Sequence, residues 1–512
     1  MALSRDLGLG EPLFHSHWLR RGNCLTLIRQ PANSMVSLFF QPPMTLLTTL
    51  LAQAAAPAKA AAEAAEVAGP GLGYLLGVLV AAIVLLLVMI LVLRLQAFIA
   101  LIIASIFTAI AAGMPLGDIP NTIVSGMGGA LGFIATIIGL GAIFGQILEH
   151  SGGAHTLANS LVGLFGQKRA SWAMLLTGFL ISIPVFLDVG LVIVAPIIYA
   201  LARDTKKSLL LFGLPLVCGM AVTHAFVPPT PGPVAVAEIL GADLGRVILY
   251  GIAIGLPTAI IVGIFMVPKI CKGIEVDIPA FFEEAKESGP LPNFGLVSLI
   301  MGLPIVLIVL GSTWAKADDP TQLQTVIGFL GHPVIALLLA TLLALLFLGV
   351  MRGVPKDKLL DLSTKALGPA GIIILITGAG GVFKAILGAS GVGDALAEWL
   401  GGYGISAVIL AYLFSMIVRV AQGSATVAMM TAAGLMAGIV TAGDYSAADL
   451  ALITIAIAAG STMLSHVNDS GFWIISRYLG MTEAQTLKTW TILSVAISLI
   501  GFALTLVLSM VI

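Results

Sequence analysis

Long apolar segments recur along most of this chain, and they constrain its fold more than any other feature of the sequence. A helix needs about 20 apolar residues to cross the hydrocarbon core of a bilayer, where helices satisfy their backbone hydrogen bonds internally. The segments are 74–93, 96–114, 131–149, 170–202, 209–227, 246–267, 294–311, 326–350, 365–387, 404–441, 450–464 and 489–512. The sequence therefore predicts an all-α polytopic membrane protein.

Composition agrees with this prediction and argues against other classes. Charged residues make up 10% of the chain, whereas soluble domains carry about 25%. The net charge of −1 gives no reason to expect a nucleic-acid partner. The cysteines lack the spacing of a metal site, and no phosphate-binding Gly-x-x-x-x-Gly-Lys-[Ser/Thr] motif occurs. We therefore expect no cofactor, no metal and no ATP-driven step, and no enzymatic nucleophile–base constellation is visible.

Residues 1–73 differ in kind from the rest of the chain. They mix charges, prolines and aromatics without a helical period, and 44–54 is a short apolar run of the kind found in signal peptides. We expect a poorly structured N-terminal extension here. It is either a signal-like segment or the result of a start codon placed too early, with Met35 and Met44 as the alternative starts.

The two halves of the remaining chain resemble one another at a constant offset. The segment 141–152 aligns with 380–391, which gives an offset of 391 − 152 = 239 residues. The same offset still pairs Leu240-Gly241 with Leu479-Gly480 about a hundred residues later. A repeat at this period is expected. The predicted organisation is a first transmembrane repeat at 74–268, a linker at 269–293 and a second transmembrane repeat at 294–512.

The placement of basic residues predicts that the second repeat is inverted. Lysines and arginines flank the apolar segment 170–202 on both sides, whereas the loops that flank 404–441 contain none. Under the positive-inside rule, the first segment begins and ends in the cytoplasm and the second begins and ends outside. Each is therefore expected to be a re-entrant helical hairpin. With about five transmembrane helices plus one hairpin per repeat, the second repeat is upside down and the linker is cytoplasmic.

Prolines and glycines stop the helices at four places, two of them inside apolar segments and two where an apolar segment ends. Such breaks expose backbone amides and carbonyls, which a membrane tolerates only where they are buried in protein or line a cavity. Half-helix N-termini that point inward favour an anion. We expect the four breaks to converge near the middle of the membrane, at the interface of the repeats. The residues expected to break the helices are Pro184, Gly190, Pro228, Pro231, Gly232, Gly423 and Gly471.

Arg419 is the one charged residue between 404 and 441. A charge at the centre of a membrane segment is costly, so it marks a functional site by default; the alternative is an arginine that reaches to the membrane surface. A guanidinium among hydroxyl and amide groups suits a small, hydroxylated organic anion. The residues expected to bind this substrate are Arg419, Gln422, Ser424, Thr426, Thr230, Asn468 and Ser470.

Acidic and histidine residues at the breaks are the candidates for proton coupling. His466 stands close to Asp469 in the sequence, and histidine is the side chain that titrates nearest to neutral pH. Two candidates have structural alternatives: Asp188 as a cap of a half-helix, and His224 as a packed core residue. The expected proton carriers are Asp188, His466, Asp469 and His224.

Three stretches resemble the gluconate permease family of proton symporters, within the larger ion transporter superfamily. They are Thr223-His-Ala-Phe-Val-Pro-Pro-Thr-Pro-Gly-Pro-Val-Ala-Val-Ala237, Arg419-Val-Ala-Gln-Gly-Ser-Ala-Thr-Val-Ala428 and Ser465-His-Val-Asn-Asp-Ser-Gly-Phe-Trp473. The resemblance extends from about residue 75 to the C-terminus. It implies uptake of sugar acids such as gluconate, with relatives that take other hydroxy acids or D-serine. It also implies residence in the cell inner membrane and, through similar dimeric carriers, a homodimer with an elevator-type movement.

Two positions depart from the family pattern. Thr230 stands where the gluconate carriers have a histidine, and Asp188 stands where the family often has a glutamate. Both departures bear on substrate and coupling. The sequence predicts proton-coupled symport of gluconate or a related small hydroxylated monocarboxylate across the cytoplasmic membrane. Two alternatives stay open, namely a sodium-coupled organic-anion or D-serine carrier on the same fold, and a passive facilitator.

Overall fold

The computed structural model describes residues 70–277, 279, 290–315, 319–395, 398, 406–467 and 469–512. Nearly all of the predicted N-terminal extension, residues 278 and 280–289 of the predicted linker, and Asn468 lie outside the described residues. Within the described ranges every regular element is a helix.

The helices of the first half run from α2 to α11. They are α2 (Leu72–Leu91), α3 (Ala97–Ala111), α4 (Asp118–His150), α5 (Gly153–Phe165), η2 (Gln167–Arg169), α6 (Ala170–Ile181), α7 (Leu187–Thr205), α8 (Leu210–Phe226), α9 (Pro231–Leu240), α10 (Leu244–Ile260), the π-helical turn η3 (Ile261–Met266) and α11 (Val267–Ile270). The last three form one continuous helical stretch.

The helices of the second half run from α12 to α22. They are α12 (Phe294–Thr313), α13 (Gln322–Leu330), α14 (Pro333–Leu343), η4 (Ala344–Gly349), η5 (Val350–Arg352), α15 (Lys356–Ala389), α17 (Ala407–Gln422), α18 (Ala425–Ala442), α19 (Ala447–Ser461), α20 (Ser470–Tyr478), α21 (Glu483–Thr486), η6 (Leu487–Thr491) and α22 (Ile492–Ser509). Over the described residues of both halves, 9 helical stretches are long and apolar enough to cross a membrane. The prediction of an all-helical, multi-span protein is confirmed.

The helix boundaries recur at the offset found in the sequence. Helix α9 begins at residue 231 and α20 at residue 470, which is 231 + 239. The stretch from α10 to α11 covers 244–270, and the stretch from α21 to α22 covers 483–509, which is the same interval shifted by 239. The helix boundaries of these stretches are therefore shared between the halves.

Both segments that were predicted to form hairpins are broken in the middle. In the first, α6 ends at Ile181 and α7 begins at Leu187, and Pro184 lies in the turn between them. In the second, Gly423 has a φ of +88° between α17 and α18, a left-handed conformation that glycine adopts without steric cost. Gly190 was expected to break the helix, but it lies inside the first turn of α7, because the chain has already turned by Phe186.

The other two breaks interrupt α8–α9 and α19–α20. The first contains Pro228, and α9 then begins with Pro231 at its first position, where the missing N–H would have no partner in any case. Gly232 and Gly471 lie in the first turns of α9 and α20 rather than in the breaks.

One predicted membrane segment differs from the structure. The apolar run 326–350 was expected to be a single helix, but it contains two helices, α13 and α14, that meet at Gly331. Pro333 starts α14, and a side chain at Gly331 would collide with the backbone of Gly311 in α12. Glycine therefore lets the chain turn tightly against α12. Because apolar residues continue through this turn, hydrophobic periodicity alone did not show it.

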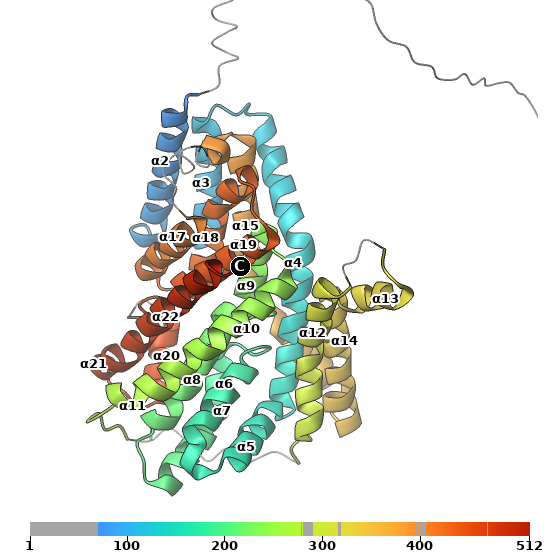
Figure 1. Ribbon diagram of the computed structural model, residues 1–512, viewed down its shortest axis with the longest axis vertical. Helices are drawn as coiled ribbons and strands as arrows, with labels where there is room; N and C mark the ends of the chain where they lie inside the picture. Colours follow the sequence, from blue (N-terminus) through green and yellow to red (C-terminus); the bar gives the residue numbers. More distant parts are fainter. Residues whose placement is uncertain are drawn as a thin grey trace, which may run out of the picture. The chain divides into compact units, whose positions relative to one another are not determined.

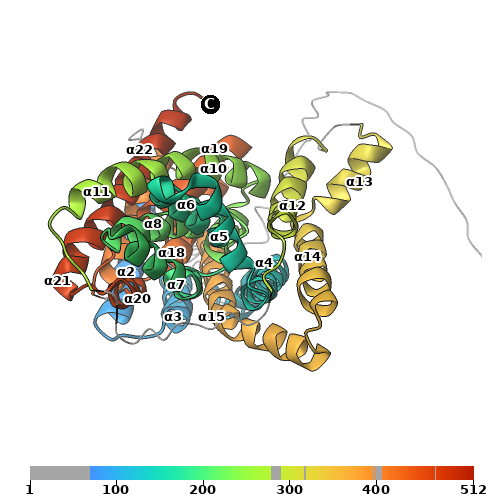
Figure 2. The ribbon, with the colours of Figure 1, turned by 90° about the horizontal axis from the view of Figure 1, so that it is seen from below.

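The two halves pack in the same manner around the breaks. Helix α6 lies along α8, and α17 lies along α19; Figure 1 shows the first pair in the lower part of the view and the second pair above it. Helices α4 and α15 pack along each other, and α9 contacts both. Helices α12 and α14 lie beyond α4 in both Figure 1 and Figure 2.

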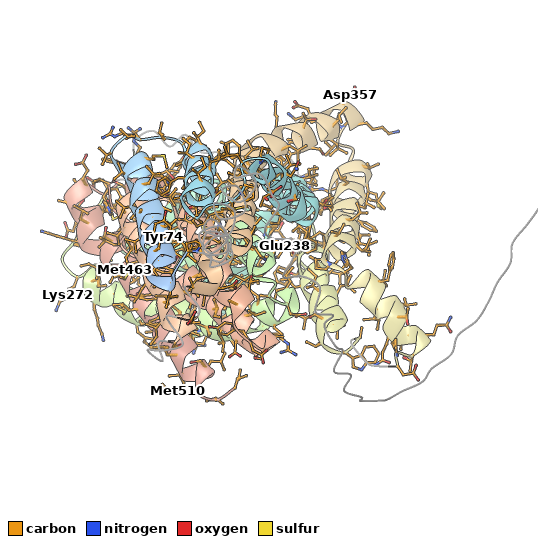
Figure 3. The ribbon with its side chains drawn as sticks, turned by 90° about the horizontal axis from the view of Figure 1, so that it is seen from above. Tyr74, Glu238, Lys272, Asp357, Met463 and Met510 are labelled. Carbon is orange, nitrogen blue, oxygen red and sulfur yellow. The ribbon has the colours of Figure 1, made fainter. Side chains whose placement is uncertain are left out.

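Several charged side chains lie at helix ends, as a membrane protein requires. Figure 3 shows Lys272, just after α11, and Asp357, in the first turn of α15, at the outer edge of the view. Glu238, which belongs to α9, lies nearer the centre. Its neighbour across a cavity of about 230 Å³ is Lys384 of α15, whose ammonium donates to the carbonyl of Ile239. Lys384 therefore caps the C-terminal end of α9.

Two glycines bring the backbones of α6 and α8 into direct contact. A side chain at Gly178 would overlap the carbonyl of Leu216, and a side chain at Gly219 would overlap the carbonyl of Leu175. Small residues at helix crossings allow this close approach in membrane proteins, where packing rather than the hydrophobic effect holds helices together. The start of the first hairpin is therefore fixed directly against α8.

We expect Gly178→Ala to lower the free energy of unfolding by about 1–3 kcal/mol, because the added methyl must push two backbones apart. Gly302→Ala in α12 is the matched control, because nothing lies within 4 Å of the added carbon there. The measurement is thermal unfolding of both purified variants in the same detergent. Equal stability of the two variants would show that α6 and α8 are not in this contact.

Candidate functional site

Three of the four helix breaks meet at a cavity of about 380 Å³, a size typical of sites for small organic molecules. The wall is formed by the start of α7, one face of α8, the turn between α17 and α18, and the break between α19 and α20, with further residues from α15, η6 and α22. The polar residues that line it are Asp188, His224, Arg419, Ser424, Thr426, Ser461, Thr462, Asp469, Ser470, Trp490 and Ser494.

The fourth break lines a second, much smaller cavity of about 20 Å³. Thr230 and Pro231 at the start of α9 face the turn of the first hairpin across it. Phe186 and His224 line both cavities, so the two are neighbours. All four breaks thus lie around one region, but Thr230 is not in the wall of the larger cavity. Its hydroxyl donates instead to the carbonyl of Val227 at 2.7 Å.

Arg419 is buried, with 4% of its surface exposed, and it has protein partners. Its Nη2 lies 2.5 Å from Oδ2 of Asp469, and its Nη1 donates to the carbonyl of Gly423. Its Nε has no hydrogen-bond partner among the described residues. A buried charge without a counter-charge is very costly, so the ion pair explains how the guanidinium is tolerated here. Arg419 therefore lies inside the protein and does not reach an exposed surface.

Asp469 connects this ion pair to the rest of the site. It is the N-cap of α20, where Oδ1 accepts from the backbone N–H of Gly471 at 3.0 Å. Its Oδ2 also accepts from Oγ of Ser465 at 2.5 Å, and that hydroxyl accepts from Nε1 of Trp490 at 2.7 Å. A hydrogen-bonded chain therefore runs from Arg419 through Asp469 and Ser465 to Trp490.

Three half-helices begin at the larger cavity, and their N-termini differ in charge. Helix α7 has Asp188 in its first turn, and α20 has Asp469 as its N-cap. Helix α18 has no acidic residue in its first turn, and its N-cap is Ser424, whose Oγ accepts from Val427 N at 3.4 Å. Helix N-termini attract anions, and the N-termini of α7 and α20 already have a carboxylate of their own. The N-terminus of α18, next to Arg419, is the positive end left open.

The structure brings many of the predicted site residues together. Arg419, Ser424, Thr426, Ser470, Asp188, Asp469 and His224 all line the larger cavity. The ring of His224 packs against Phe186 with centroids 6.3 Å apart, and its Nδ1 is buried without a partner among the described residues.

Other predicted residues lie apart from the cavity wall. Gln422 ends α17 and is not in the lining, and its Oε1 is buried without a partner among the described residues. His466 places Nε2 3.1 Å from the carbonyl of Val420. Asn468 lies outside the described residues, so its position in the site stays a prediction.

Sequence reasoning missed a hydroxyl-bearing wall of the cavity. Ser461 and Thr462 come from the end of α19, Ser494 comes from α22, and Trp490 comes from η6. Ser494 accepts a hydrogen bond from the backbone N–H of Ser465 at 2.9 Å. Serine and threonine occur throughout the apolar helices, and only the fold shows which of them face the cavity. Ser465, which binds Ser494 but does not line the cavity, was visible in the sequence, because it begins one of the three motifs that resemble the family.

The arrangement suits a small acid with hydroxyl groups. The N-terminus of α18 and Arg419 offer donors to a carboxylate, and the residues of α19 and α22 in the wall offer hydroxyls to a polar chain. Over the described residues, no group of three or more histidine, cysteine, aspartate or glutamate side chains could hold a metal ion.

Several known proteins are similar to this chain in sequence. A family model described as GntP family permease matches residues 74–511. The low-affinity gluconate transporter of Escherichia coli (strain K12) is 40% identical over 392 residues, which cover 76% of this chain and 88% of that protein. The gluconate permease of Pseudomonas aeruginosa is 38% identical over 408 residues, covering 78% and 90%. The inner membrane permease YgbN of Escherichia coli (strain K12) is 41% identical over 411 residues, also covering 78% and 90%.

Among solved structures, the YdaH transporter of Alcanivorax borkumensis is similar in fold, with a TM-score of 0.57 and 14% sequence identity. The match covers 76% of this chain and 88% of that one. At this identity the likeness concerns the fold alone. The family model, in contrast, covers almost all of the chain after residue 73, and it confirms the family predicted from the three motifs. This chain is a multi-pass membrane permease, not an enzyme, and it belongs to the GntP permease family.

Proposed function

We propose that this protein is a secondary active transporter that carries gluconate, or a related small hydroxylated monocarboxylate, together with a proton. The observation that carries the proposal is a buried arginine in a hydroxyl-lined cavity, next to the half-helix N-terminus of α18, which has no acidic residue in its first turn. The names of the relatives support the substrate class, since two of the three described above are gluconate carriers. The protein would act in the cytoplasmic membrane, as the name of a third relative indicates for that protein.

The fold is proposed to consist of two inverted repeats, 74–268 and 294–512, joined by a cytoplasmic linker at 269–293. The shared helix boundaries at the offset of 239 support the repeat, and the distribution of lysine and arginine supports its inversion. Inverted repeats with a site between them suit alternating access. A homodimer and an elevator-type movement complete the proposal, and both rest on the family resemblance alone.

The proposed substrate carboxylate binds Arg419, with Ser424, Thr426 and the first amides of α18 as further donors. The substrate hydroxyls face Ser470 and the wall formed by α19 and α22. Gln422, Thr230 and Asn468 stay as proposed contributors. Gln422 and Thr230 would act from the border of the cavity, since neither is in its wall, and Asn468 lies outside the described residues.

The charges of the cavity favour proton coupling. Arg419 is balanced by Asp469, which leaves Asp188 as an additional carboxylate in the wall. A monocarboxylate that enters adds a further negative charge, and like charges in a poorly hydrated site repel strongly. A proton that enters with the substrate removes this repulsion. Asp188, Asp469, His224 and His466 are the proposed carriers.

We expect Arg419→Ala to abolish gluconate uptake, because the carboxylate loses its counter-charge. Arg419→Lys should reduce uptake at least tenfold, because an ammonium cannot bridge the Gly423 carbonyl and a carboxylate as the planar fork does. The measurement is counterflow of labelled gluconate in proteoliposomes. In Arg419→Ala, Asp469 loses its ion-pair partner, and this alone could disturb the site. The double variant Arg419→Ala/Asp469→Asn, which has no unpaired aspartate, controls for that effect. Normal counterflow in the alanine variant would remove Arg419 from the site.

We expect an inwardly directed proton gradient, with the outside more acidic, to drive gluconate accumulation in proteoliposomes without sodium. A protonophore should abolish accumulation while leaving counterflow intact, because counterflow needs no net proton movement. Accumulation driven by a sodium gradient at constant pH would establish the sodium-coupled alternative. Equilibration without accumulation under either gradient would establish a passive facilitator.

We expect hydroxylated monocarboxylates to compete with labelled gluconate far better than their deoxygenated analogues. Hexanoate, which has the same chain length and no hydroxyl groups, should bind at least tenfold more weakly, because the hydroxyl-lined wall would lose its partners. A panel with glycerate, D-serine and keto acids defines the substrate class. Equal competition by hexanoate would contradict the role given to the α19–α22 wall.

A further inference from the structure

We propose that Asp469 and the substrate carboxylate occupy Arg419 in turn, so that protonation of Asp469 and binding of the substrate form one linked exchange. This inference deepens the proposed function and rests on it. It selects one coupling residue from four candidates and explains why an internal ion pair lies at the place where an anion should bind.

The guanidinium of Arg419 already holds an anion in this structure. Its contact with Asp469 is shielded from solvent, since the side chains are 5% and 13% exposed. Arg419 is also the one arginine or lysine in the wall of the cavity formed by the described residues. A substrate carboxylate at the same cation would bring two negative charges within a few ångströms of each other, which strongly favours a proton on one of them. Competition for one cation therefore couples the two ligands.

Arg419 is held in place independently of Asp469. Its Nη1 donates to the carbonyl of Gly423, in the turn that joins α17 to α18. Its Nε is buried and has no partner among the described residues, so the guanidinium has an unused donor. The N-terminus of α18, which follows the same turn, has no acidic cap. When Asp469 becomes neutral, the arginine stays beside an open half-helix end with donors for a new carboxylate.

Asp469 has partners that serve it in both protonation states. Oγ of Ser465 lies 2.5 Å from Oδ2, and a hydroxyl can donate to a carboxylate or accept from a carboxylic acid. Ser465 is itself fixed by three contacts: Nε1 of Trp490 at 2.7 Å, Oγ1 of Thr491 at 2.5 Å and Oγ of Ser494 at 2.9 Å. The N-cap bond to Gly471 uses the other carboxyl oxygen. Asp469 can therefore lose its ion pair without losing its place.

The other titratable groups around the cavity are less directly placed. Asp188 comes from α7 and His224 from α8, and neither has a hydrogen bond or ion pair with Arg419 among the described residues. His466 contacts the carbonyl of Val420 in α17 and does not line the cavity. Asp469 is the titratable group whose charge meets the guanidinium directly. It is the carboxylate that a substrate would have to displace.

The exchange conserves charge. A proton from solution adds to an oxygen of Asp469, the Arg419–Asp469 ion pair breaks, and an Arg419–substrate ion pair forms. The proton brings one positive charge and the monocarboxylate one negative charge, so the loaded and empty sites carry the same net charge. The exchange therefore predicts one proton per substrate and a cycle that the membrane potential does not drive.

The test is gluconate binding to the purified full-length protein over a range of pH, with Asp469→Asn and Asp188→Asn compared. In the wild type, affinity should fall about tenfold per pH unit above the range in which Asp469 is protonated, because one proton is linked to each substrate. Asp469→Asn should bind with an affinity that does not depend on pH. Asparagine keeps the N-cap through its carbonyl oxygen, and its NH2 group donates, as a protonated carboxyl does, in place of the oxygen that pairs with Arg419. Asp188→Asn removes the other carboxylate of the cavity wall and so tests the rival carrier. The exchange requires this variant to keep the wild-type slope, whatever its affinity for gluconate.

Each result decides between the alternatives. The exchange is overturned if the gluconate affinity of Asp469→Asn changes with pH as steeply as that of the wild type. It is also overturned if Asp188→Asn, rather than Asp469→Asn, loses this pH dependence. Loss of all binding in a folded Asp469→Asn protein also overturns it. Should that variant not fold, the wild type provides the second measurement: a proton-to-gluconate ratio other than one, or uptake driven by membrane potential, contradicts the exchange. If the wild type transports gluconate with an affinity that does not depend on pH, the exchange is overturned but the proposed function stands. If the wild type neither binds nor transports gluconate, both the proposed function and the exchange are overturned.

Discussion

The buried ion pair between Arg419 and Asp469 is the interaction on which the site depends. A guanidinium inside an apolar helix is unfavourable unless a counter-charge reaches it, and Asp469 reaches it only because the helix is broken between α19 and α20. The break also exposes the backbone N–H that Asp469 caps and places Ser465 beside the carboxylate. One charge thus requires a broken helix, and the broken helix provides the polar groups of the site.

The repeat supplies a symmetric scaffold, whereas the charges are placed on it asymmetrically. At the offset of 239, Arg419 corresponds to Leu180, Asp469 to Thr230, and Asp188 to Val427. The helix boundaries repeat closely, yet the residue that corresponds to each charged residue of the cavity in the other half is uncharged. A duplicated backbone can form two related sets of breaks. A single substrate site needs only one cation, and the sequence places that cation in the second half.

Much of this site could be predicted from the sequence because its signals are local. Pro184, Pro231 and Gly423 interrupt helices by their own backbone chemistry, and Arg419 is conspicuous in an apolar run. The pairing of Arg419 with Asp469 was not predictable, since it joins residues 50 positions apart in a fold that no local pattern specifies. The hydroxyls of α19 and α22 were missed for a related reason, because a serine in an apolar helix gives no sign of the direction in which it faces.

The glycine contact between α6 and α8 has a mechanical consequence. Where two backbones touch without side chains between them, neither helix can roll or slide over the other without a collision of carbonyl groups. Gly460 in α19 meets the backbone of α17 in the same way, so the equivalent joint in the second half is equally stiff. The first arm of each hairpin is thus locked to a broken helix. These contacts argue against a gate in which the first arm of either hairpin swings away from its broken helix.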